Sequence, residues 1–231
     1  MNKALRVGIL GAGLGSRLQS RAKAKPLAEV SGKSLLAHLV SRLQAAGVEE
    51  ITCALREELL SSADRASLPQ APGLRYLFVN TESSLHTLGA LIEEMSAAKG
   101  PAVFTMADTV LFPADLKLFI ETAAVMPAGE CAILATTFVE DEKPLWVTLD
   151  ERGYTKKFGG EAGDCITSGM YALSPQAMNI AMENIAAGKS KMRNFLADLA
   201  ERQVAVKSVV VAKTIDVDHP SDLDMAEAFF R

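Results

Sequence analysis

Short apolar runs alternate along the chain with longer segments in which apolar residues recur every three or four positions. The short runs, bounded by turn residues, predict buried strands, and the longer segments predict amphipathic helices. Alternation of this kind favours a mostly parallel sheet covered by helices. In the first 137 residues the predicted strands are Leu5–Leu10, Ile51–Leu55, Tyr76–Val79, Ala102–Met106 and Ala132–Thr136, and the predicted helices are Leu35–Ala46, Leu85–Ala97 and Pro113–Val125.

The second part of the chain continues this pattern after a polar stretch, Glu140–Asp164. Two short strands in that stretch would form an antiparallel excursion. No linker and no repeat interrupts the pattern, so residues 1–231 are predicted to form a single α/β domain. It is an open, mostly parallel, Rossmann-like mixed sheet with helices on both faces. The elements predicted here are strands Trp146–Thr148, Lys156–Phe158, Thr167–Leu173 and Val206–Val211, and helices Pro175–Ala187, Met192–Arg202 and from Pro220 onward.

Composition narrows the class of protein. The chain has 231 residues, of which 49% are hydrophobic, and this is enough for one sizeable core. No apolar run approaches the roughly 20 residues that span a bilayer, and the net charge of −4 argues against a general nucleic-acid surface. Three cysteines without pairable spacing are typical of core residues in a reducing compartment. We therefore expect a cytoplasmic protein with no membrane or nucleic-acid partner.

Glycines and positive charges gather near the N-terminus. Residues 7–17 read VGILGAGLGSR, so an apolar run feeds three alternating glycines, Gly11, Gly13 and Gly15. Backbone amides in such a loop can face a ligand closely, because no Cβ intervenes. Residues 17–33 hold five positive charges and one negative charge, which gives +4. The pattern predicts a polyphosphate site rather than a solvated basic loop; the charged residues are Arg17, Arg21, Lys23, Lys25, Lys33 and the opposing Glu29.

A dinucleotide site of the NAD type is the first alternative, since Gly11-x-Gly13 after a strand is its opening. The third glycine position would be Ser16, and good helical periodicity resumes only at Leu35. The second predicted strand is followed by Arg56, where an NAD site needs an acid for the ribose. The context therefore disfavours an NAD-binding protein.

Acidic residues at strand ends are the candidate partners of a bound polyphosphate. Asp108 follows the apolar strand Ala102–Met106, at the edge where open α/β sheets bind ligands, although it could also cap the next helix. Asp216 and Asp218 close a later strand, and their even spacing predicts that both lie on one face. Ser221-x-x-Asp224 instead resembles a capping box that begins the last helix.

The N-terminal motifs resemble the nucleotidyltransferase family of sugar-phosphate and phosphocholine-type enzymes. The resemblance rests on Gly13-x-Gly15-Ser16-Arg17, then Lys25-Pro26-Leu27, and then Gly32-Lys33-Ser34-Leu35. It implies the nucleotide-diphospho-sugar transferase fold, with residues 1–137 mainly binding the NTP and 138–231 mainly binding the acceptor. It also implies transfer of a nucleotidyl group from an NTP to a small phosphomonoester, with release of pyrophosphate.

The same resemblance implies roles for individual residues. Arg17 and Lys25 would be catalytic, on the β- and γ-phosphates and on the α-phosphate respectively. Asp108, with Asp216 or Asp218, would bind Mg²⁺. The substrate-binding positions would be Leu10, Gly11, Ala12, Gly13, Gly15, Ser16, Ser84 and Gly169.

The sequence leaves the substrates open. The segment Val79–Leu85 looks like that of phosphocholine-type and small sugar-phosphate enzymes, which favours CTP or UTP; Ser84 in it is equally a helix N-cap. The acceptor is a sugar 1-phosphate, phosphocholine or a similar ester, and Lys156 or Lys157 could meet its phosphate. The alternatives are a molybdopterin guanylyltransferase-like enzyme and a nucleotide-binding module without catalysis. Oligomeric state is not addressed by the sequence.

Overall fold

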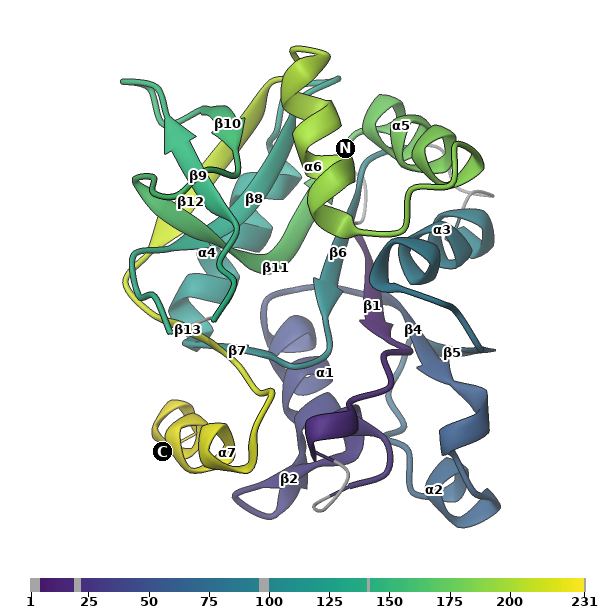
Figure 1. Cartoon of the computed structure of the whole chain (residues 1–231). Coiled ribbons are helices and arrows are strands. Elements are labelled where there is room, and N and C mark those ends of the chain that lie inside the picture. Colours follow the sequence, from purple (N-terminus) through teal and green to yellow (C-terminus); the bar gives the residue numbers. More distant parts are fainter. Residues whose placement is uncertain (1–4, 19–21, 96–99, 141, 231) are drawn as a thin grey trace.

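A nine-stranded mixed sheet forms the centre of the computed structural model, which describes residues 5–18, 22–95, 100–140 and 142–230 (Figure 1). Its main path is β10-β9-β11-β6-β1-β4-β5, and β8 joins β11 to β12. The strands are β1 (Arg6–Gly11), β4 (Glu50–Arg56), β5 (Leu74–Val79), β6 (Ala102–Met106), β8 (Cys131–Thr136), β9 (Trp146–Leu149), β10 (Thr155–Phe158), β11 (Cys165–Leu173) and β12 (Val206–Val211).

The sheet changes character at β11. On one side β6, β1, β4 and β5 are all parallel, as the strand–helix alternation predicts. β11 runs antiparallel to β6, β8 and β9, and β12 returns parallel to β8. The antiparallel excursion predicted for the polar stretch is confirmed, since β9 pairs with β10. The expected mixed α/β architecture is therefore the observed one.

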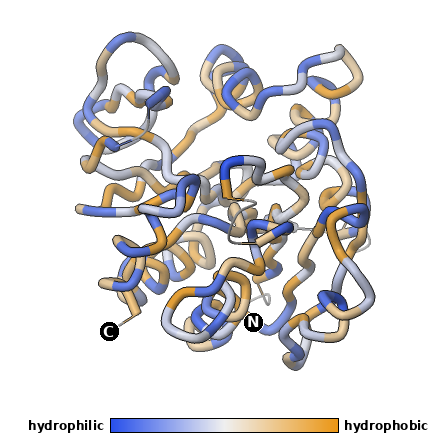
Figure 2. The backbone as a smooth tube through the Cα atoms, turned by 60° about the horizontal axis from the view of Figure 1, so that its bottom comes forward, coloured by the Kyte–Doolittle hydropathy of each residue, from blue (hydrophilic) through white to orange (hydrophobic). Residues whose placement is uncertain are grey.

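Helices cover both faces of the sheet. The apolar stripes of α1 and α4 pack on one face, and those of α3, α5 and α6 pack on the other. In Figure 2 hydrophobic (orange) and hydrophilic (blue) residues alternate along the helical coils, as expected of amphipathic helices. The helices are α1 (Leu35–Ala45), α2 (Ser62–Ala66), α3 (Ser84–Met95), α4 (Pro113–Ala124), α5 (Pro175–Ala186), α6 (Met192–Glu201) and α7 (Pro220–Ala226).

A third apolar cluster joins the two ends of the chain. Leu18 and Val30, from the segment after the glycine loop, pack with Ile215, Val217 and Phe229 near the C-terminus. Two short strands continue this contact, because β13 (Thr214–Asp216) pairs antiparallel with β7 (Thr109–Leu111) directly after β6. The C-terminal acids are thereby held beside Asp108.

Most predicted elements agree with the structure within two residues. The helix expected over Leu85–Ala97 begins at Ser84 and is described to Met95; Ala97 lies outside the described residues. The very short strands β2 (Glu29–Val30), β3 (Lys33–Ser34) and β7, and the five-residue α2, were not predicted. Cys53, Cys131 and Cys165 are free and buried, as expected. Within the described ranges, every helix is too short or too polar to cross a bilayer.

Candidate active site

The topology places a ligand site at the carboxyl ends of β1 and β6. The connection that follows β1 runs to β4 on one side, whereas β6 lies on its other side. Such a reversal of strand order opens a crevice beyond the strand ends, where open α/β sheets bind their ligands. The glycine loop follows β1 and Asp108 follows β6, so both border this crevice.

The three glycines of the loop have different structural requirements. Gly11 is packed, since an added Cβ would lie 2.9 Å from the Ala54 carbonyl oxygen. Gly15 has φ +54°, and its added Cβ would meet Lys25 Cβ at 2.7 Å. Nothing lies within 4 Å of a Cβ added at Gly13. Gly15 is therefore needed for the loop conformation, whereas Gly13 leaves open space over the backbone.

Backbone amides of the loop are available to an anion. Among the described residues, the structure shows no protein acceptor for the amides of residues 13–17. Ser16 begins a 3-10 turn, Ser16–Leu18, and the Arg17 side chain is 55% exposed beside it. Unpaired amides next to an exposed guanidinium suit a polyphosphate.

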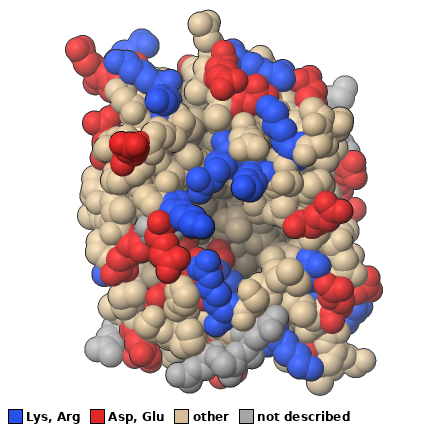
Figure 3. Space-filling model, viewed as in Figure 1, with Lys and Arg blue, Asp and Glu red and all other residues tan. Residues whose placement is uncertain are grey.

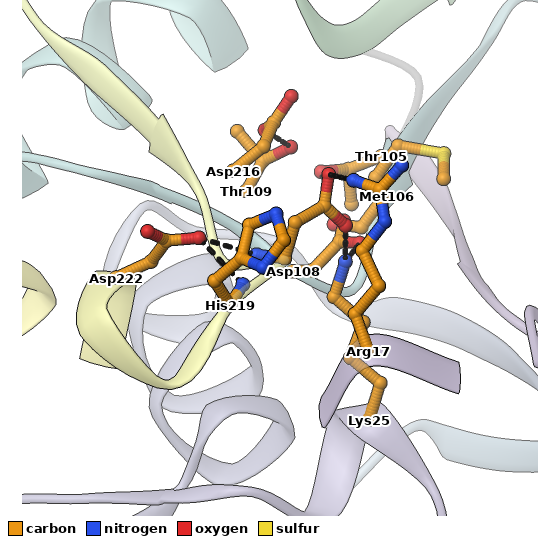
Figure 4. A network of polar contacts seen from close by, with 10 residues as sticks. Arg17, Lys25, Thr105, Met106, Asp108, Thr109, Asp216, His219 and Asp222 are labelled. Carbon is orange, nitrogen blue, oxygen red and sulfur yellow. Dashed lines mark hydrogen bonds and ion pairs between the residues drawn. The ribbon is translucent and has the colours of Figure 1, made fainter. Parts of the chain in front are cut away.

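Lys25 is the centre of the polar network (Figure 4). Its ammonium pairs with Asp108 and, at 2.5 Å, with Asp218; Arg17 lies 3.8 Å from Asp218. Burial alone would lower the pKa of Lys25, but the two carboxylates outweigh it and raise the pKa, so the ammonium stays charged. The position is well fixed, because the Lys25 side chain is only 12% exposed.

Asp216 faces the same crevice from β13. Asp216 is exposed to solvent, and it lines two adjoining cavities, so its carboxyl lies within a recess of the surface. Desolvation and the nearby charge of Asp108 raise the pKa of the Asp216 carboxyl to about 7, although the Thr109 hydroxyl donates to it at 2.8 Å. Desolvation and the charge of Asp108 therefore favour the protonated form of the Asp216 carboxyl.

The carboxylates fit a hard cation. A single ammonium already bridges Asp108 and Asp218, so a cation placed between them would meet oxygen ligands from both. In the described parts of the chain no three acidic, histidine or cysteine residues form a complete metal cage. The two carboxylates that Lys25 bridges are the kind of ligand set in which one or two carboxylates act together with substrate phosphates on a divalent cation.

Two of the expectations about the C-terminal acids are wrong. β13 ends at Asp216, so Asp216 and Asp218 do not share a strand face: the first accepts from Thr109 and the second pairs with Lys25. The last helix is not capped by Ser221 and Asp224. Asp222 caps it instead, accepting from the amides of Asp218 and His219 at 2.8 and 2.7 Å. This cap fixes the backbone at Asp218.

A basic cavity of about 350 Å³ lies beside the acids. Lys and Arg side chains gather around a hollow in the face seen in Figure 3. Lys143, from the loop before β9, and Arg193, in the first turn of α6, line the cavity, and Arg193 donates to the Lys143 carbonyl at 3.0 Å. The chain therefore offers a second anion-binding region next to the first. The cavity is also lined by Ser83, Ser84, Met106, Thr167, Gly169, Tyr171, Lys191 and Asp216.

Gly169 and Ser84 both line this cavity, and the structure shows the local conformation that places each of them there. Gly169 has φ +63°, and a Cβ there would lie 2.5 Å from Thr109 Oγ1, so it allows β11 to approach the acid cluster. Ser84 is the first residue of α3 and not its N-cap. Ser83 fills that position, because its hydroxyl accepts from the His86 amide at 3.3 Å.

Some predicted contacts are not supported by the geometry. The Leu10 and Ala12 side chains are buried, the Leu10 carbonyl accepts from Ala107, and the Ala12 carbonyl accepts from Arg56. Lys156 and Lys157 are exposed on β10 and do not line the basic cavity, whereas Lys143, Lys191 and Arg193 were missed. These three follow no motif, so only the fold reveals them.

Only part of the basic N-terminal segment belongs to the site. Arg17 and Lys25 contact the acid cluster. Lys23 and Lys33 are exposed outside it, and Arg21 lies outside the described residues. Of the described cations in this segment, therefore, Arg17 and Lys25 border the crevice and Lys23 and Lys33 do not.

Comparison with known proteins identifies relatives. The family model of the MobA-like NTP transferase domain matches residues 7–206, which include the glycine loop, Lys25 and Asp108 but not Asp216 or Asp218. A probable mannose-1-phosphate guanylyltransferase 2 of Arabidopsis thaliana is 25% identical over 187 residues, covering 74% of this chain and 50% of the relative. The chain thus spans about half the length of that curated relative.

Solved structures share the fold across nearly the whole chain. The inositol-1-phosphate CTP transferase from T. maritima aligns with a TM-score of 0.79 and 17% identity, covering 100% of this chain and 97% of that one. HddC from Yersinia pseudotuberculosis, complexed with GMP-PN, aligns with a TM-score of 0.71 and 24% identity, covering 98% and 100%. These likenesses show the fold.

Proposed function

Because the chain belongs to the family of MobA-like NTP transferase domains, a nucleotidyltransferase family, we propose that it joins an NTP to a small phosphomonoester and releases pyrophosphate. One observation carries the proposal: Lys25 bridges Asp108 and Asp218 directly beside a loop of unpaired amides. The arrangement combines a polyphosphate cradle with a carboxylate pair that suits a divalent cation. This nucleotidyltransferase class agrees with the sequence resemblance.

The reaction is a direct displacement. An oxygen of the acceptor phosphate forms a bond to the α-phosphorus, the bond from that phosphorus to the β-bridging oxygen breaks, and pyrophosphate leaves. The attacking phosphate is already ionised, so alignment and charge stabilisation limit the rate. In this proposal the amides of residues 13–17 and the Arg17 guanidinium hold the β- and γ-phosphates.

Lys25 has a separate role from Arg17. It leaves Asp108 and Asp218 for the α-phosphate oxygens, where its permanent charge offsets the charge that develops during the displacement. Asp108 and Asp218, with Asp216 beside them, would hold Mg²⁺. When bound, that ion would supply charge neutralisation to the reacting phosphates.

The acceptor occupies the basic cavity in this account. Lys143, Lys191 and Arg193 provide positive charge for a phosphomonoester, and Gly169, packed against Thr109, lets β11 line the cavity beside Asp216. The proposed acceptors are sugar 1-phosphates, phosphocholine and similar small esters. The proposed nucleotide is CTP or UTP; the curated relative named above is a probable guanylyltransferase and one structural neighbour is a CTP transferase, so the assay compares all five bases.

A pyrophosphate-release assay tests the proposal. CTP, UTP, GTP, ATP and dTTP would each be supplied with Mg²⁺ and a panel of sugar 1-phosphates, phosphocholine and molybdopterin. Release with one base and one acceptor, lost in Asp108→Asn, supports it. Release with molybdopterin and GTP alone would favour the molybdopterin guanylyltransferase-like alternative, with which the MobA-like family model is compatible. NTP binding without release would favour a non-catalytic module.

A further inference from the structure

Arg56, at the carboxyl end of β4, joins two loops that are far apart in sequence. Its Nη1 donates to the Thr81 carbonyl at 2.7 Å and to the Ala12 carbonyl at 3.2 Å. Ala12 opens the glycine loop after β1, and Thr81 lies in the loop between β5 and α3. The Arg56 side chain is 13% exposed, and its Nε pairs with Glu58. The guanidinium is therefore held in place between the two loops.

The loop over residues 80–84 is ordered by further contacts from the same corner. The Glu58 amide donates to Asn80 Oδ1 at 3.1 Å. The Thr81 and Thr87 hydroxyls lie 2.6 Å apart, and the Thr87 hydroxyl also donates to the Ser83 carbonyl at 3.1 Å. Arg56 and Glu58 thus fix one end of this loop, while the first turn of α3 fixes the other.

If the proposed function holds, the position of these two loops relative to the acids indicates that they face the nucleoside of the NTP. In the proposed function the α-phosphate would lie on the β6 side, beside Asp108 and Lys25. The acceptor cavity extends from there toward Arg193 and α6. The nucleoside must therefore extend from the α-phosphate in another direction. The surface that remains at the carboxyl ends of the parallel strands is that of β4 and β5, which Ala12 and Thr81 border.

We propose that Arg56 is a positioning residue that sets the spacing between the glycine loop and the start of the 80–84 loop at Asn80 and Thr81, and so forms the nucleoside half of the site, whereas Ser83 and Ser84 line the acceptor cavity. It acts through the two carbonyl groups and not on the reacting phosphates. Its loss leaves both carbonyls without their charged donor, and the two loops are then free to separate. The Gly13 amide shares its peptide unit with the Ala12 carbonyl, whereas the amides of residues 14–17 lie beyond it, and Gly15 among them lies against Lys25 Cβ.

Binding measured without turnover tests this assignment. Dissociation constants in Mg²⁺ would be measured for tripolyphosphate and for whichever of the five NTPs binds the wild type most tightly. Arg56→Ala is expected to weaken NTP binding about tenfold or more and tripolyphosphate binding less than about threefold. Arg56→Lys keeps one charged donor and should fall between. Arg65→Ala is the matched control, because Arg65 lies nearby but pairs with Glu57 and the Phe78 ring.

Two results would overturn the inference: unchanged NTP affinity in Arg56→Ala, or an equal loss for NTP and tripolyphosphate, which would mean that Arg56 only supports the phosphate loop. Circular dichroism confirms folding, and Arg56→Lys decides the question if Arg56→Ala does not fold. Failure of the proposed function is a different result, in which the wild type itself binds no NTP or releases no pyrophosphate.

Discussion

An added methyl group should have different effects at two glycines of the loop: at Gly15 it should lower the stability of the fold, and at Gly13 it should lower nucleotide affinity. At Gly15 the backbone has φ +54°, and the new Cβ would lie 2.7 Å from Lys25 Cβ. At Gly13 the new Cβ would have no neighbour within 4 Å. Gly15→Ala is therefore a test of the fold, and Gly13→Ala is a test of the ligand site.

The expected magnitudes follow from this geometry. A left-handed conformation costs an L-residue about 1–2 kcal/mol, and the contact with Lys25 Cβ adds roughly 1–2 kcal/mol, because a backbone-linked atom must shift. Gly15→Ala should therefore lower the free energy of unfolding by about 2–4 kcal/mol. For a chain of this size that corresponds to a fall in Tm of about 4–16 °C. Gly13→Ala should change Tm by less than about 2 °C.

Nucleotide binding separates the two variants further. The methyl group at Gly13 would fill the space in which phosphate oxygens approach the amides, so NTP affinity should fall about tenfold or more. Thermal melts and calorimetric titration with an NTP and Mg²⁺ measure both quantities. Unchanged affinity in Gly13→Ala would refute the assignment of the loop to phosphate binding. Unchanged stability in Gly15→Ala would refute the packing of Gly15 against Lys25.

Three further predictions concern the acids and the C-terminus. Lys25→Met should lower turnover by on the order of 10²–10³ and tighten Mn²⁺ binding without nucleotide, because it removes the ammonium between Asp108 and Asp218; weaker Mn²⁺ binding by electron paramagnetic resonance would contradict this. Since the pKa of Asp216 is raised from 3.8 to about 7, the folded protein holds a proton between these values that the unfolded chain has lost, so stability should fall as pH rises from 4 to 7. Asp216→Asn should flatten that slope in urea titrations at several pH values, and an identical slope would argue against the shift. Phe229→Ala should cost about 3–5 kcal/mol in urea unfolding, because the ring is 4% exposed in the cluster that holds the C-terminus; a loss below about 1 kcal/mol would show that this cluster is not well packed.

The sequence predicts the sheet well, because strand and helix periods are local properties of the chain. Leu35–Ala45 and Ala102–Met106 have continuous apolar patterns, and both elements form as expected. A strand ending near Asp216 was predicted, but β7, of three residues, is too short for a pattern, and its pairing with β13 is a tertiary contact that no local pattern shows. That pairing, not local propensity, carries Asp216 next to Thr109.

The sequence predicted only those site residues that belong to a motif or follow a predicted strand. Arg17, Lys25 and Asp108 could be predicted from motif spacing and strand ends, and the structure brings them together with Asp218. The even spacing of Asp216 and Asp218 was misleading, because the chain leaves the strand between them. In the sequence, Arg56 was notable only because an NAD site would need an acid at that position. Its contacts with Ala12 and Thr81 could not be predicted, because they join loops that are distant in sequence.

The most direct test of the central claim follows the nucleotidyl group itself. Wild type and Asp108→Asn would be incubated with Mg²⁺, the acceptor panel and NTP labelled at the α-phosphorus, and the products separated after rapid quenching. The account predicts that the label moves into an acceptor-linked diphosphate ester in step with pyrophosphate release, and that Asp108→Asn forms neither. Label that stays in NTP, or that appears only as free NMP whatever the acceptor, would contradict it.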